Sequence, residues 1–87
     1  MKKVFILVSM ELNKVNEFQS KDYEVFSTFK RAIDAMTYKL ENESAENVVY
    51  DDCSPYTEHK NSLVTYTNNG FKKRMYIREE KINNWSY

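Results

Sequence analysis

The sequence predicts a small α+β fold, a two-layer sandwich of one helix on a mainly antiparallel sheet of three to five strands. Three features carry this prediction: an apolar run near the start, one segment with helical periodicity, and an Asn-Gly hairpin signal near the end. The chain has 87 residues, the size of one domain. We therefore expect a single domain over residues 1–87, ordered as strand, optional strand, helix, strand and a final two-strand hairpin.

The first expected strand covers residues 4–12. Every even position of this run is apolar, whereas the odd positions change from apolar Phe5 and Leu7 to polar Ser9 and Glu11. A strand with one apolar face and one half-apolar face is typical of a central position in a sheet. Since Gly70 is the only glycine, turns that need a positive φ are expected at asparagine.

The next segments lead into the helix. Residues 13–23 are mostly polar and predict a loop or loose hairpin arm, followed at 23–26 by a short strand or an extended approach to a helix. Ser27-Thr28 is a helix start signal, because a hydroxyl can accept from a free backbone N–H. The helix is expected to end near Glu43. Apolar residues at helical spacing define its inward stripe, namely Phe29, Ala32, Ile33, Met36 and Leu40.

The C-terminal part predicts more strands. Residues 47–53 indicate a short strand, and 62–67 and 71–78 are rich in β formers on either side of Asn69-Gly70. With these two residues at the centre of the turn, Val64 should face Met75 on the side that meets the helix. Alternation then places seven residues on the outer face: Leu63, Thr65, Thr67, Lys72, Arg74, Tyr76 and Arg78.

Composition excludes several classes of function. Thirteen Lys and Arg balance thirteen Asp and Glu, which argues against a uniformly basic nucleic-acid binder. A single Cys excludes a disulfide framework or a Cys-based zinc site, and no apolar run is long enough to cross a membrane. Cys53 and His59 are the one candidate nucleophile–base pair, with no oxyanion or phosphate loop beside them. We expect no enzymatic activity, no metal and no cofactor.

The charges are balanced in sum but separated along the chain. Residues 41–58 hold six acids and no Lys or Arg, whereas 60–81 hold six bases and two acids. Aromatic residues make up 15% of the chain, so some rings should be exposed and available to a partner. Two candidate surfaces follow. The acidic set for a protein partner is Asp51, Asp52, Tyr56 and Glu58; the basic set for nucleic acid is Lys72, Arg74, Tyr76 and Arg78.

Three short segments carry a resemblance: the opening strand at 2–8, the Phe26-Ser27-Thr28 helix start within 25–32, and the closing segment at 76–83. In outline, over most of its length, the chain resembles small uncharacterised proteins of phages and mobile elements in low-GC bacteria. The resemblance brings no catalytic residue with it. It implies a phage context, in which proteins of this size often inhibit host nucleases or defence systems, anti-CRISPR proteins among them.

The leading functional expectation is therefore a non-enzymatic phage or mobile-element protein in the cytoplasm of a bacterial host. It would bind and block a host protein, such as a defence nuclease or CRISPR effector, through the acidic set. One alternative is a small DNA- or RNA-binding module that uses the basic set. Another is a self-associating structural subunit, in which an exposed edge strand pairs two copies as a homodimer.

Overall fold

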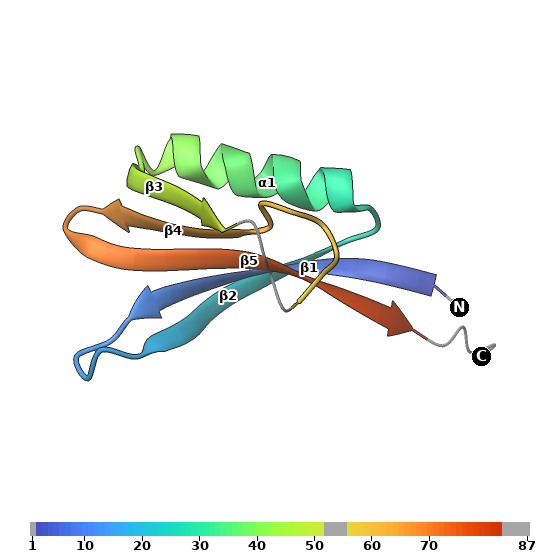
Figure 1. The fold of residues 1–87 in the computed structure, drawn as a ribbon, viewed down its shortest axis with the longest axis horizontal. Helices are drawn as coiled ribbons and strands as arrows, with labels where there is room; N and C mark the ends of the chain where they lie inside the picture. Colours follow the sequence, from blue (N-terminus) through green and yellow to red (C-terminus); the bar gives the residue numbers. More distant parts are fainter. Residues whose placement is uncertain (1, 52–55, 83–87) are drawn as a thin grey trace.

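The computed structural model describes residues 2–51 and 56–82. These residues form one antiparallel sheet in the order β2-β1-β5-β4-β3, and α1 lies along one of its faces (Figure 1). The elements are β1 (Lys2–Leu12), β2 (Phe18–Phe26), α1 (Phe29–Asn42), β3 (Glu46–Asp51), β4 (Leu63–Asn68) and β5 (Phe71–Ile82). The predicted α+β class is confirmed, with one helix and five strands among the described residues. The predicted order differs in detail, because the optional strand is a full one.

β2 decides between the two alternatives for residues 13–23, a loop or a loose hairpin arm, because residues 18–23 form part of an arm paired with β1. The strand begins at Phe18 rather than at Tyr23, and it pairs with β1 along its whole length. Its residues between the two ends are exposed on both faces, because β2 is an edge strand, so no apolar alternation reveals it. A register shift opposite Ser9 and Met10 marks a bulge in this edge. Bulges and charges at an edge oppose pairing with a second copy.

α1 begins and ends close to where the sequence predicts. Thr28 is the N-cap, and its hydroxyl accepts from the Arg31 backbone N–H at 3.2 Å. Glu43 is the C-cap. Buried side chains at Ala32, Met36 and Leu40 confirm the inward stripe, with Phe29 and Ile33 packed beside them. This stripe holds the helix on the sheet.

The core lies between α1 and one face of β1, β5 and β4. Phe5 and Leu7 of β1 belong to it, so the helix covers the odd positions of this strand. The even positions, all apolar from Val4 to Leu12, lie on the opposite side of the sheet. From the other strands the core takes Val64, Tyr66, Met75 and Ile77. The more apolar face of β1 is therefore the one that the helix leaves uncovered.

The C-terminal hairpin has the predicted register. Asn68 pairs with Phe71 and Val64 with Met75, around a turn with φ of 50° at Asn69 and 82° at Gly70. β5 continues to Ile82, past the predicted end at 78, because it pairs with β1 from Lys73 to Ile82. β1 is flanked by β2 and β5, which confirms its place inside the sheet.

β3 is a short edge strand. The sequence predicts a strand at 47–53, and the structure has Glu46–Asp51, every residue of which is exposed. A register shift between Glu46 and Val49 interrupts its pairing with β4. Asp52 and Cys53 lie outside the described residues. Within the described part of the chain, no helix combines the length and apolar character that a membrane crossing needs.

Candidate functional site

The face of the sheet opposite α1 carries most of the residues of interest, and we call it the open face. Strand pairing places Val8 of β1 between Tyr23 of β2 and Tyr76 of β5 on this face. Its other members include Val4, Ile6, Met10, Leu12, Phe18, Ser20, Val25, Val49, Leu63, Thr65, Thr67, Lys72, Arg74 and Arg78, together with the acids Glu46, Asp51 and Glu80. The open face is thus an apolar strip along β1, with cations, aromatic rings and a smaller number of acids on the other strands.

The basic set lies together on the open face, as the hairpin register predicts. Lys72, Arg74, Tyr76 and Arg78 alternate along β5 with residues that face the helix, such as Met75. β5 is the middle strand of the sheet, so these cations lie at the centre of the face. A central row of positive charge can contact an anionic partner that lies along β5.

Arg74 and Arg78 are held by neighbours. The Arg74 guanidinium lies over the Phe18 ring, 4.2 Å from its centroid, and its Nε donates to the Thr65 hydroxyl at 3.3 Å. Arg78 forms an ion pair with Glu80 on its own strand. The contacts of Arg74 fix the direction of its side chain, which lowers the entropy lost on binding, whereas an anionic partner must displace Glu80 to reach Arg78.

Two tyrosines meet at the centre of the face. Tyr56, in the loop after β3, stacks on Tyr76 with ring centroids 4.1 Å apart and planes at 21°. Burial raises the pKa of Tyr76, Tyr56 raises it further, and Arg78 lowers it. The phenol is therefore neutral at physiological pH and does not repel an anion. Tyr23, one strand beyond β1, is 69% exposed.

A pocket of about 530 Å³ opens between Tyr23 and Tyr76, and we call it the β1 pocket. Ile6 and Val8 come from the strand between its two sides. It is also lined by Ser20, Lys21, Asp22, Tyr23, Tyr76 and Arg78. An apolar floor with aromatic rings and two cations beside it suits a planar ring that is joined to an anionic group, and Asp22 is the one acid in the lining.

The acidic set does not form a surface separate from the open face. Asp51 ends β3 opposite Leu63, at the edge of the open face, and Tyr56 stacks on Tyr76 within it. Glu58 is exposed in the loop, and Asp52 lies outside the described residues. Residues from both predicted sets therefore reach one face of the sheet.

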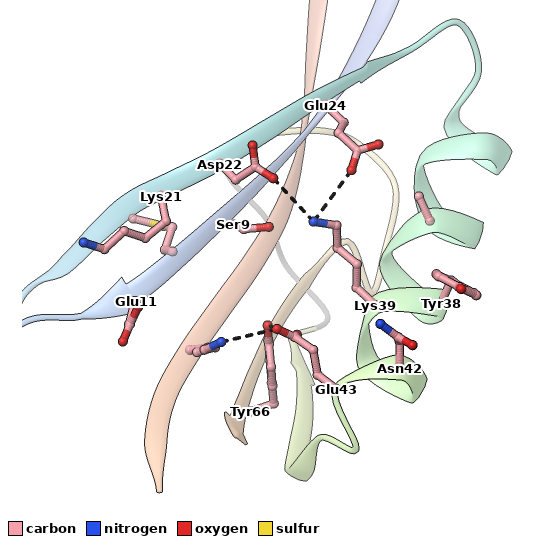
Figure 2. Close-up of a pocket in the computed structure, with 13 residues that line it drawn as sticks. Ser9, Glu11, Lys21, Asp22, Glu24, Tyr38, Lys39, Asn42, Glu43 and Tyr66 are labelled. Carbon is pink, nitrogen blue, oxygen red and sulfur yellow. Dashed lines mark hydrogen bonds and ion pairs between the residues drawn. The ribbon is translucent and has the colours of Figure 1, made fainter. Parts of the chain in front are cut away.

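A second cavity, of about 620 Å³, lies on the helix side between α1 and the β1–β2 hairpin (Figure 2). Lys39 of α1 reaches Asp22 at 3.7 Å and Glu24 at 3.6 Å on β2. Across the cavity, the carboxylate of Glu43 accepts from the Tyr66 hydroxyl at 2.9 Å and from Lys73 at 3.2 Å. These ion pairs and hydrogen bonds connect the helix and its C-cap to the sheet.

Tyr66 is the one buried phenol at this cavity. Burial is the largest cause that raises the pKa of Tyr66, and the hydrogen bond to Glu43 and the charge of that carboxylate raise it further. The phenol therefore stays protonated and cannot act as a base at neutral pH. In the described residues, no side-chain polar atom is both buried and without a partner. The charged groups of the helix-side cavity named above are thus already paired with one another, which makes this cavity the weaker candidate for a ligand site.

The candidate Cys–His pair falls partly outside the described residues, which include His59 but not Cys53. The His59 ring stacks on Phe29 at 3.9 Å and meets Phe5 edge-on at 6.1 Å. These contacts give His59 a packing role at the start of α1. No cluster of three metal-ligating side chains occurs in residues 2–51 and 56–82.

The sequence does not indicate Tyr23 and Phe18 as functional candidates, because Phe18 is expected in a loop or loose hairpin arm and Tyr23 at the start of a short segment with no assigned partner strand. Tyr23 and Val25 are two residues apart, and this spacing is the one signal of a shared strand face. Comparison of the chain with protein-family models, with curated proteins and with solved structures finds no match.

Proposed function

We propose that this protein binds nucleic acid on the open face of its sheet. The observation that carries the proposal is the row of Lys72, Arg74, Tyr76 and Arg78 on the middle strand, on the side that α1 leaves uncovered. Cations along a groove neutralise phosphates, and aromatic rings among them stack on bases. An open antiparallel sheet presents both groups on one surface.

Acids on the same face reduce the charge of this row but do not remove it. Glu80 of β5 forms an ion pair with Arg78 and offsets its charge, whereas the acids of β3 lie at the far edge of the sheet. The formal charge of zero therefore conceals a positive stretch at Lys72 and Arg74, and a phosphate that displaces Glu80 can contact Arg78 as well.

The test is a salt-dependent titration with a labelled oligothymidine of about ten nucleotides. Each phosphate contact to a single strand contributes a slope of about −0.7 to log K against log salt, so three cations give about −2. Binding should then weaken about fifteen-fold between 50 and 200 mM salt. The triple variant K72Q/R74Q/R78Q should abolish most of this dependence.

A matched control removes the same charge elsewhere. Lys14, Lys30 and Arg31 are exposed and lie in the β1–β2 turn and on α1, off the open face. The variant K14Q/K30Q/R31Q should bind as the unmodified protein does. Equal losses in both triple variants would mean that the open face is not the binding surface. No binding at low salt by the unmodified protein would refute the proposal.

A second candidate keeps the phage inhibitor expectation, with the same face blocking a host protein such as a defence nuclease or CRISPR effector. It is favoured by Val25 and Val49, which are 56% and 62% exposed and contribute nothing to phosphate binding. Asp51 and Tyr56 would add the acidic and aromatic contacts. Capture from host lysate should then resist nuclease treatment, and D51K/E58K should weaken the complex.

A further inference from the structure

We infer that the β1 pocket holds one unpaired base, so that the open face selects single-stranded over duplex nucleic acid. This inference rests on the proposed function and names the class of ligand. The inference is based on the strand register, which places Val8 of β1 directly between Tyr23 of β2 and Tyr76 of β5. The β1 pocket, which these three residues line, has a volume of about 530 Å³.

The spacing of the two tyrosines suits a sandwiched ring. Their strands are separated by β1, so their backbones are roughly 10 Å apart. A ring placed between two others needs about 7–8 Å, since each contact takes about 3.5–4.0 Å. A small tilt of either tyrosine side chain toward the other would bring the two rings to this separation. Tyr23 is 69% exposed, so its ring is available.

The outer side of Tyr76 is already supported. Tyr56 stacks on it at 4.1 Å, and the Tyr56 carbonyl accepts from the Glu79 backbone N–H at 3.1 Å. The Tyr76 ring is therefore held in place before a base arrives. Tyr23 lies on an edge strand with no such support, so it is the ring expected to adjust.

Charge around the pocket fits a base that is joined to phosphates. Lys21 and Arg78 line the pocket together with the tyrosines. The one acid in the lining, Asp22, lies 3.7 Å from Lys39 on the helix side, which offsets its charge. A base that enters between the tyrosines would therefore place its flanking phosphates near cations.

Duplex nucleic acid cannot use this pocket without losing a base pair. Paired bases are stacked inside the double helix, and their faces become available only in single strands or when a base is extruded. Stacking on an exposed ring tolerates any base, so selection would depend on strand state rather than on sequence.

The experiment compares three probes of about ten nucleotides: oligothymidine, the same backbone with abasic sites, and a duplex. Thymidine monophosphate is titrated beside them as the free nucleotide. The abasic probe keeps the phosphates and removes the rings. Oligothymidine should bind about tenfold more tightly than either of the others. Y23A should remove this advantage, whereas Y23F should keep it. Y38A is the matched control, because Tyr38 is 67% exposed on α1.

The outcomes separate this inference from the proposed function. If all three probes bind equally and with the expected salt slope, the face binds phosphates but the base pocket is wrong. Equal effects of Y23A and Y38A would also overturn the pocket. If thymidine monophosphate binds as tightly as the oligonucleotide, the site is for a free nucleotide and the assignment to a strand fails.

Discussion

Tyr56 and Tyr76 stack face to face, with ring centroids 4.1 Å apart. β4 pairs with β5 no further than Tyr76, and two residues of the loop before β4 bond to β5 beyond that point. The Glu79 and Ile77 N–H groups donate to the carbonyls of Tyr56 and Ser62, at 3.1 and 2.9 Å. The loop thus substitutes for a strand, and the tyrosine pair fastens it to the open face.

Removing this stack should loosen the loop without unfolding the sheet. Aromatic pairs contribute about 0.5–1.5 kcal/mol, and Tyr56 is 41% exposed, so Y56A should cost about 1 kcal/mol. Urea denaturation measures this cost, and Y56F is the control that keeps the ring. A Y56A protein as stable as Y56F would show that the stack contributes nothing.

The hairpin turn should depend on Gly70. Its φ is +82°, and a Cβ added there would meet no atom within 4 Å, so the cost of a side chain is conformational. G70A should destabilise the protein by about 1–2 kcal/mol. N69G should be nearly neutral, because Asn69 already has a positive φ that glycine adopts freely. Equal stability of G70A and the unmodified protein in thermal unfolding would contradict this turn geometry.

Docking of α1 should depend on Met36, which is fully buried against the sheet. M36A should lower the free energy of unfolding by about 2–5 kcal/mol, because it leaves a cavity in the core. T37A changes the next residue, which is exposed, and should cost less than about 0.5 kcal/mol. Similar losses in both variants would mean that the helix does not pack through this stripe.

The Tyr66–Glu43 hydrogen bond predicts a pH dependence at alkaline pH. The folded protein raises the pKa of Tyr66 above its ordinary value of 10.0. Stability from the protonated phenol is therefore complete below pH 10 and is lost as the pH rises above it. Urea unfolding between neutral pH and pH 11 measures the loss. Y66F should lose less stability over this range, and parallel curves for both proteins would contradict the assignment.

The sequence predicted those parts of the fold in which local chemistry determines geometry. The Asn69-Gly70 turn set the hairpin register, and that register placed the basic set on one face. Thr28 capped the helix as expected. Asparagines carry four of the five positive-φ positions outside glycine in the described residues, as the scarcity of glycine suggests.

The parts that escaped prediction depend on long-range pairing. β2 has exposed residues on both faces, so only its hydrogen bonds to β1 make it a strand. Without β2, Tyr23 could not be placed beside Val8, and the base pocket stayed hidden. The periodicity of β1 also could not show which face the helix covers, because both faces begin apolar.

The most direct test of the open face as a binding surface is an amide chemical-shift titration of the labelled protein with oligothymidine. We predict that the shifts cluster at Tyr23, Val8 and Tyr76 and at their neighbours on β1, β2 and β5. The exposed side of α1, marked by Asp34 and Tyr38, should not respond. Shifts centred on α1, or no shifts at all at low salt, would contradict binding on the open face.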